Sequence, residues 1–365
     1  MSETPDAGST APRDDSARLR ERVCDAHAAQ RPLRVRGGGT KDFYGRDSEG
    51  SDVLDTTQHG GIVSYEPSEL VLTVRAGTAL TVIDEALAGG AQMLPFEPPA
   101  FGEGATIGGT VACGLSGPRR AAAGACRDFV LGVRVITGTG EILSFGGQVM
   151  KNVAGYDVSR LMTGAFGTLG VLLDVSFKVL PRPEAEHTVV FECSAPQAVA
   201  RLAALGRQAL GVSAACWDGQ RLRVRLSGNE RGVRAAHAAI GGDVDIDGAA
   251  FWEALREHRL AWFDDARPLW RLALPPATPV SSALSGDWLI DWEGSQRWLL
   301  TEEAPERVFD AARASGGHAL LFRASRREGV FMDALDPVTA RLHRRLKQAF
   351  DPGGILNPGR IYPDW

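Results

Sequence analysis

The sequence has few cysteines, and they carry no metal-binding pattern. The five are odd in number and widely spaced, and none belongs to a C-x-x-C pair: Cys24, Cys113, Cys126, Cys193 and Cys216. Iron–sulfur clusters need grouped cysteine ligands, and a disulfide framework needs paired ones. We therefore expect no iron–sulfur cluster, no bound metal and a reducing compartment.

Long apolar runs and an excess of positive charge are also missing. Uncharged apolar stretches such as residues 171–173 fall far short of the roughly 20 residues that cross a bilayer. Forty basic against 45 acidic residues give a net charge of −5, so binding to a nucleic-acid backbone is not expected. Residues 1–16 lack the basic and apolar regions of a signal peptide and are predicted to form a disordered tail. We expect a cytoplasmic protein that reaches the inner membrane only through partners.

Two familiar nucleotide-binding signatures are absent. No G-x-G-x-x-G follows a strand and opens a helix, and no G-x-x-x-x-G-K-[ST] occurs. A Rossmann site for NAD and a P-loop are therefore both unsupported.

Glycine, in contrast, is abundant and unevenly distributed. The 43 glycines concentrate in residues 37–39, 102–124, 138–170 and 353–359. The chain is too long for one ordinary core, and Pro181 and Pro183 end a predicted strand. We expect a tail (1–16), a site-building domain (17–183), a second domain (184–345) and a segment that returns to the first domain (346–365).

Hydrophobic periodicity predicts a mixed α+β chain. Helices are expected at residues 16–29, after Gly77-Thr78, and at 305–314 and 341–350. Strands are expected at residues 33–36, 69–76, 130–136, 141–145, 171–179 and 222–226.

Three glycine-rich segments suggest a cofactor site. In Arg36–Lys41, consecutive glycines let backbone N–H groups converge, and Arg36 and Lys41 add positive charge, as an anion cradle requires. A plain surface turn explains that segment equally well when it is taken alone. Residues 105–112 and 164–170 have few large side chains, which suits a flat ring or a phosphate lying against the backbone. Three such loops in one domain favour a large cofactor.

Several strings resemble a known family of flavoproteins. RGGGT at 36–40, ATIGG at 105–109, RDFVLGVRVITGTGEI at 127–142, GTLGV at 167–171 and DPGGILNPGR at 351–360 resemble proteins with a PCMH-type FAD-binding domain, the vanillyl-alcohol oxidase and D-lactate dehydrogenase group. LPFEPP at 94–99, GPRR at 117–120, FGGQVMKNVAGYDVSRLM at 145–162 and VLPRP at 179–183 resemble the FAD-binding subunits, or subunits E, of bacterial glycolate oxidases. The resemblance implies an α+β fold: a PCMH-type domain of two α/β subdomains, a smaller cap-like α+β domain, and a C-terminus that returns to the FAD domain.

The resemblance also implies the residues that bind FAD. The first loop would hold the pyrophosphate, the second segment would follow the flavin and ribityl chain, the third would line the adenine side, and Asn357 would reach the ring. These residues are Arg36, Gly37, Gly38, Gly39, Thr40, Thr106, Ile107, Gly108, Gly109, Ala112, Gly117, Gly167, Leu169, Gly170, Val171 and Asn357. Covalent attachment in the family uses a His in the first loop or an added Cys, and the loop has neither, so FAD is expected to bind non-covalently.

The same resemblance leaves the catalytic residues unknown. Dehydrogenases of the group carry paired histidines and a G-E-H-G string in the second domain, and neither is found here. His318, after Gly316-Gly317, is a weak candidate, and a hydrogen-bonded structural histidine is the competing interpretation. Six second-domain tryptophans are predicted mainly to pack in the core, with an exposed subset at a partner face: Trp252, Trp262, Trp270, Trp288, Trp292 and Trp298.

Three functions remain open at this point. By resemblance, the chain is an FAD-binding subunit of a complex that oxidises glycolate to glyoxylate, beside a catalytic FAD subunit and an iron–sulfur subunit. The first alternative is a self-contained FAD-dependent 2-hydroxy-acid dehydrogenase. The second is a flavin-free scaffold, because Gly114 and Phe166 replace an Asn and an acid that are usual in the family.

Overall fold

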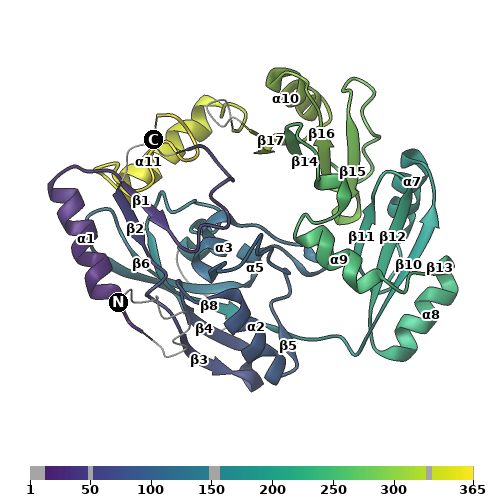
Figure 1. Cartoon of the computed structure of the whole chain (residues 1–365), viewed down its shortest axis with the longest axis horizontal. Helices are drawn as coiled ribbons and strands as arrows, with labels where there is room; N and C mark the ends of the chain where they lie inside the picture. The colour runs from purple at the N-terminus through teal and green to yellow at the C-terminus, as the bar shows by residue number, and fades with distance from the viewer. Residues whose placement is uncertain (1–12, 48–51, 148–156, 326–330, 365) are drawn as a thin grey trace, which may run out of the picture.

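The computed structural model describes residues 13–47, 52–147, 157–325 and 331–364. Two large sheets dominate these residues, and each lies at the centre of one domain (Figure 1). The five-stranded sheet has the order β3-β4-β8-β6-β7, and the eight-stranded sheet has the order β13-β10-β12-β11-β15-β16-β14-β17. No helix in the described part of the chain is long and apolar enough to span a membrane.

The five-stranded sheet of the first domain is antiparallel throughout. Its central strand, β8, contributes to two core clusters, and its Leu173, Val175 and Phe177 are fully buried. The strands are β3 (Ile62–Glu66), β4 (Val71–Arg75), β6 (Val130–Ile136), β7 (Ile142–Gly146) and β8 (Val171–Lys178).

Helices of the first domain pack on this sheet through apolar stripes. In α2, Leu80, Ile83 and Leu87 recur at helical spacing and join the core that includes Phe177. The short elements here are η1 (Pro67–Glu69), α2 (Leu80–Gly89), α3 (Ile107–Cys113), α4 (Arg120–Ala123), α5 (Cys126–Phe129) and α6 (Val158–Leu161).

Two small sheets complete the first domain. The parallel pair β1 (Leu33–Arg36) and β2 (Asp52–Asp55) packs under α1 (Ser16–Ala28), and β5 (Gln92–Met93) pairs with β9 (Leu180–Pro181). Residues 13–16, which were predicted to belong to a disordered tail, are ordered: the N–H of Arg13 donates to the carbonyl of Gly60 over 2.9 Å, and α1 begins at Ser16.

The second domain is one antiparallel sheet of two half-sheets. Strands β11 and β15 join the halves through a single pair, Trp217 with Ile290. The strands are β10 (Ala185–Glu192), β11 (Val212–Trp217), β12 (Arg221–Gly228), β13 (Asp243–Val244), β14 (Leu269–Ala273), β15 (Asp287–Asp291), β16 (Gln296–Leu300) and β17 (His318–Arg323). The helices are α7 (Ala195–Leu205), α8 (Glu230–Ile240), α9 (Gly248–Arg256), η2 (Ala261–Phe263), η3 (Trp292–Gly294) and α10 (Pro305–Ala314).

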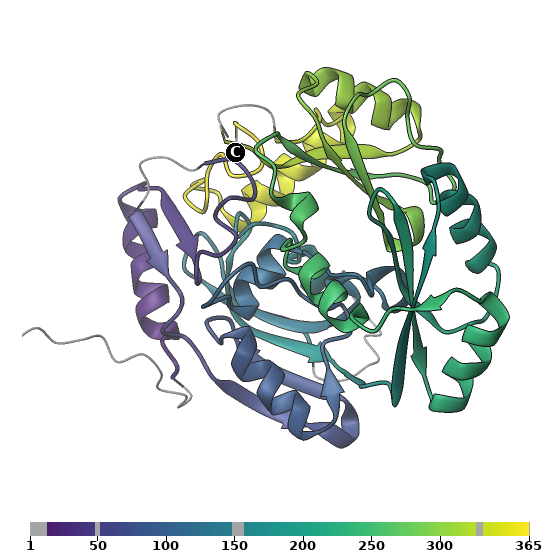
Figure 2. The same ribbon diagram turned by 45° about the vertical axis from the view of Figure 1, so that its right-hand side comes forward.

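After β17 the chain returns to the first domain. Helix α11 (Pro337–Phe350) leads to a terminal segment that lies beside β1 in both views (Figures 1 and 2), where the N–H of Leu33 donates to the carbonyl of Ile355 over 2.7 Å. The predicted domain limit at 183 falls between β9 and β10. The limit at 345 falls inside α11, which begins at Pro337 because the Asp336 carboxylate caps it.

Most elements expected from periodicity are confirmed within a residue or two. Helix 305–314 and the strand at 33–36 match α10 and β1, and the 130–145 hairpin is β6 and β7. Thr78 does not cap α2, however. Its hydroxyl donates to the carbonyl of Arg75 over 2.6 Å and accepts from the N–H of Gly61, so the helix begins two residues later.

Candidate flavin site

The first glycine loop follows β1 and lies against the turn before α3. A Cβ atom on Gly37 would collide with the Thr106 hydroxyl, and one on Gly38 would collide with the carbonyl of Gly104. Gly39 has a φ of +75°, which glycine adopts without the strain of other residues. The loop therefore approaches its neighbour at a separation that only glycine allows.

The backbone N–H groups are the second notable feature of this loop. Among the described residues, no acceptor lies within hydrogen-bonding distance of the N–H groups of Gly38, Gly39, Thr40 and Lys41. Only buried N–H groups are costly to leave unpaired, and Gly38, Gly39 and Thr40 are partly exposed, so their N–H groups are available to an acceptor from outside the chain. Such a run of free donors has the chemistry of an anion cradle.

Positive side chains reinforce the cradle. Arg34 and Arg36 both pair with Asp42 over 2.8 Å, so their charges are already partly compensated. Lys41 is only 6% exposed, and its Nζ donates to the carbonyl of Ala100 over 3.2 Å with no carboxylate in ion-pair range among the described residues. Burial lowers the pKa of Lys41, as expected for an ammonium that lacks a counter-ion. The donor set fits a diphosphate.

The second glycine segment becomes helix α3. The Thr106 hydroxyl caps it by accepting from the N–H of Gly109 over 3.3 Å. Gly108 lets the helix pack against Ala76, where a Cβ would collide, and Ile107 is fully buried in the core. Gly114 ends the helix with a φ of +64°. Gly108 and Gly114 therefore serve helix packing and helix termination, and not contact with a ring or a phosphate.

The third segment connects the cradle to β8. Gly167 has a φ of +68° and lies against the Asn357 amide. Leu169 and Val171 are buried in core clusters, and Gly170 lies close to the carbonyl of Ile136. These positions stabilise the fold around the cradle and do not face its cavity.

Asn357 cross-links three separate parts of the chain. Its Oδ1 accepts from the N–H of Val35 over 2.7 Å, and its Nδ2 donates to the carbonyl of Phe166 over 2.6 Å. Because both ends of the amide are engaged, the side chain fixes the cradle to the returning C-terminal segment.

The cavity beside the loop contains many, but not all, of the predicted residues. Its volume is ≈ 80 Å³, and the predicted residues that line it are Arg36, Gly37, Gly38, Gly39, Thr40, Thr106, Gly109, Ala112 and Asn357. The predicted residues outside its lining are Ile107, Gly108, Gly117, Gly167, Leu169, Gly170 and Val171. Of the family string at 145–162, residues 148–156 lie outside the described part of the chain.

Sequence reasoning missed Arg360, which organises the loop from the other end of the chain. Its guanidinium donates to three backbone carbonyls, those of Asp42, Tyr44 and Arg46, over 3.1, 2.6 and 2.6 Å. The signal was available, because this arginine ends the DPGGILNPGR string.

Aromatic side chains fill the space between the cradle and the second domain. Tyr44 is 3% exposed and contacts Phe166, Phe322 and Phe331 at ring-centroid distances of 5.0, 5.0 and 5.4 Å. Phe166 therefore packs in a hydrophobic cluster shared by both domains.

A second, smaller cavity of ≈ 20 Å³ lies farther along the domain interface. It is lined by Gly117, Arg271 and His258, among others. His258 stacks on Phe263 with a centroid distance of 4.0 Å, and burial, followed by nearby Arg323 and Arg271, lowers its pKa to about 3. His258 is thus neutral at pH 7. The volume accommodates about one water molecule.

His318 does not lie in either cavity. It is exposed at the start of β17, where its cross-strand neighbour is Ala273. Its position gives no support to the catalytic role considered for it, and no group of three or more metal-ligating side chains occurs among the described residues.

The α+β fold, the glycine cradle and the returning C-terminal segment define an FAD-linked oxidoreductase. Residues 12–146 match the family described as "FAD binding domain", and residues 326–361 match "FAD linked oxidases, C-terminal domain". The fold resembles that of p-cresol methylhydroxylase, with a TM-score of 0.72 over 97% of this chain and 88% of that one at 15% identity. The fold also resembles that of an alkyldihydroxyacetonephosphate synthase, with a TM-score of 0.66 over 95% of this chain and 76% of that one at 16% identity.

Within that class the chain has close curated relatives. It is 47% identical over 351 residues to the glycolate oxidase subunit GlcE of Escherichia coli (strain K12), covering 96% of this chain and 98% of that protein. The glycolate oxidase subunit GlcD of Bacillus subtilis (strain 168) is 33% identical over 169 residues, covering 46% of this chain and 35% of the relative. The chain therefore belongs to the family of the glycolate oxidase subunit GlcE.

Proposed function

We propose that this chain is the FAD-binding, electron-handling subunit of a complex that oxidises glycolate to glyoxylate. The reaction removes two electrons and two protons from the hydroxyl-bearing carbon and its oxygen. A catalytic FAD subunit would oxidise glycolate, and an iron–sulfur subunit would accept the electrons. When bound, FAD supplies a group that accepts electrons in pairs and releases them singly.

One observation carries the cofactor assignment. The run of unpartnered N–H groups at Gly38–Lys41, beside the buried Lys41 ammonium, forms a donor set that a diphosphate would satisfy. Thr40 and Thr106 add hydroxyl groups at the same cavity. A flavin-free scaffold would have no reason to bury a lysine without a counter-ion at this place.

Non-covalent binding is supported by the nucleophiles near the cavity. Cys113 lines it, but burial raises the pKa of its thiol to about 11, and a protonated thiol is a poor nucleophile. His59 is fully buried elsewhere, with its Nδ1 accepting from the N–H of Asp15 over 3.0 Å. Among the described residues of the cavity, neither group offers a link to a flavin.

The experiment is a flavin count on the purified chain, followed by acid precipitation. We expect about one FAD per chain, which appears in the supernatant after precipitation. Lys41→Met should lower occupancy strongly, whereas Arg345→Met, at an exposed position on α11, should not. A colourless wild-type protein that fails to bind added FAD would overturn the cofactor assignment, and flavin in the precipitate would overturn non-covalent binding.

The place in a glycolate-oxidising complex needs a separate measurement. Co-expression with the catalytic FAD and iron–sulfur subunits should give an assembly that reduces a dye when glycolate is added. Omitting this chain should abolish that activity. An assembly that contains this chain and has no glycolate-dependent activity would remove the proposal.

A further inference from the structure

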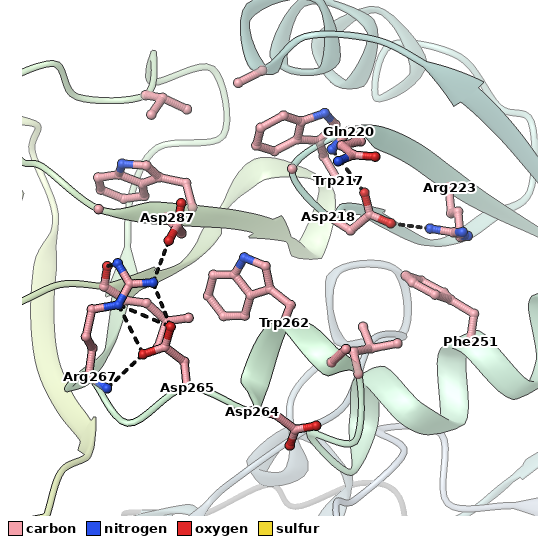
Figure 3. Close-up of a pocket in the computed structure, with 18 residues that line it drawn as sticks. Trp217, Asp218, Gln220, Arg223, Phe251, Trp262, Asp264, Asp265, Arg267 and Asp287 are labelled. Atoms are coloured by element: carbon pink, nitrogen blue, oxygen red, sulfur yellow. Dashed lines mark hydrogen bonds and ion pairs between the residues drawn. The ribbon is translucent and has the colours of Figure 1, made fainter.

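A trough of ≈ 760 Å³ lies in the second domain, where the two half-sheets separate. Strands β11 and β15 share one residue pair, whereas each pairs with its other neighbour over five positions. Beyond the pair of Trp217 and Ile290, the turn after β11 diverges from the beginning of β15. Residues of α9 and η2 line the space between them (Figure 3). The sequence identified the tryptophans of this region, and the flavin site does not use them.

Aromatic rings form much of the trough. Trp217, Trp262, Trp288 and Phe251 all line it. Trp217 is anchored, because its indole Nε1 donates to the carbonyl of Cys193 over 2.9 Å. Trp262 and Trp288 are partly exposed, and no indole hydrogen bond is formed by either within the described structure. Figure 3 shows the Trp262 indole standing between Asp287 and Phe251. Exposed tryptophans grouped in a concave surface are typical of protein interfaces.

The trough is also acidic. Four aspartates and two arginines line it: Asp218, Asp264, Asp265, Asp287, Arg223 and Arg267. Both arginines are already engaged by carboxylates, Arg223 by Asp218 and Asp245, and Arg267 by Asp265 and Asp287.

Asp264 differs from the other aspartates. It is exposed at the rim, and its carboxylate makes no ion pair or hydrogen bond with the described residues. A free carboxylate at the rim suits an ion pair with a lysine or arginine, and the partly exposed Trp262 indole elsewhere in the trough offers a ring for a cation–π contact.

The shape of the trough suits a polypeptide. From Asp287 to Leu289, β15 has no ladder partner on the side that faces β11, so an extended segment can pair with this edge. We propose that the trough docks an extended, basic segment of another subunit of the oxidase, an inference that rests on the proposed assembly. Asp264 would pair with a cationic side chain of that segment, and the segment would pack on Trp262.

The test measures binding of this full-length chain to the purified catalytic FAD and iron–sulfur subunits, each immobilised in turn. Asp264→Lys and Trp262→Ala should each raise the dissociation constant for one of those subunits at least tenfold. Glu141→Lys is the matched control, because it reverses an exposed, unpaired charge on the first domain, and it should bind like the wild type. Flavin content should be unchanged in all three variants, which shows that the fold is intact.

Each outcome has one meaning. Wild-type affinity in both trough variants would overturn the docking site and leave the assembly standing. Weakening by Trp262→Ala without weakening by Asp264→Lys would overturn the basic nature of the docked segment. If the wild-type chain binds neither subunit, the proposed assembly fails, and the docking site fails with it.

Discussion

Gly38 shows how closely one residue constrains the candidate flavin site. Its α-carbon faces the carbonyl of Gly104 with no room for a methyl group, and its own N–H is one of the free donors. The same position therefore sets both the separation of two loops and the convergence of the cradle.

At this residue we expect Gly38→Val to abolish FAD binding while the fold is retained. The new side chain would push the loops apart and occupy the place of the diphosphate. Flavin absorbance and circular dichroism measure the two effects separately. Gly89→Ala is the control, since a Cβ there has no neighbour within 4 Å. Full occupancy in Gly38→Val would show that the loop is only a turn.

Asp291 gives a prediction about pH at the same scale. It is 4% exposed, and burial raises its pKa to about 7 from 3.8. The folded state therefore holds a proton that the unfolded state releases. The contribution of the protonated Asp291 carboxyl to the stability of the folded state is fully present below about pH 4. It is lost as the pH rises through about 7.

Between pH 4 and pH 8, we expect the unfolding free energy of the wild type to fall relative to that of Asp291→Asn. The fall should be up to roughly 4 kcal/mol. Asparagine lacks the proton equilibrium but keeps a carbonyl that can accept from the N–H of Trp292. Urea unfolding at several pH values checks this. Parallel stability curves for the two proteins would contradict it.

Among the elements, α11 depends on a buried ion pair at its end. The Lys347 Nζ donates to Asp351 over 2.7 Å and to the carbonyls of Thr168 and Leu356 over 2.8 and 2.9 Å. The Asp351 carboxylate also accepts from the N–H groups of Ile355 and Leu356. One pair thus connects the helix to the turn that carries Asn357.

Lys347→Met should destabilise the protein by about 3 kcal/mol, because it leaves the Asp351 charge buried without a partner. Arg345→Met, an exposed change on the same helix, should have little effect. Adding Asp351→Asn to Lys347→Met should recover part of the loss. Denaturant unfolding measures all three variants, and a loss below 1 kcal/mol in Lys347→Met would refute the role of the pair.

For the whole molecule, the packing between the domains bears on activity. The interface is occupied by aromatic side chains, and the cavity beside His258 has a volume of only ≈ 20 Å³. That cavity accommodates about one water molecule, so a 2-hydroxy acid has no room beside His258, the histidine of this cavity that could take its hydroxyl proton.

We therefore expect the isolated chain to be a poor enzyme. Under anaerobic conditions, glycolate should leave the flavin absorbance of the pure chain unchanged for many minutes, while the reconstituted assembly turns over. D-lactate should behave in the same way. Rapid bleaching of the pure chain by either acid would instead favour a self-contained dehydrogenase.

Local sequence pattern predicted most of the helices and strands, and it left the first glycine loop open between an anion cradle and a surface turn. Stripes such as Leu80, Ile83 and Leu87 require a buried helix face, and the three glycines at 37–39 allow N–H groups to converge. These properties depend on neighbours along the chain, so periodicity was enough to predict the elements, whereas the FAD-binding role of the loop was implied only by the family resemblance.

Contacts between residues far apart in the sequence became visible in the folded chain. Asn357 contacts Val35 of β1 and Arg360 contacts Tyr44, each more than 300 positions away. Ile107 and Gly108 face the core because α3 packs against the sheet and Ala76. The trough likewise exists because two half-sheets share one residue pair. No local pattern encodes such contacts, since they follow from how the whole chain buries its apolar surface.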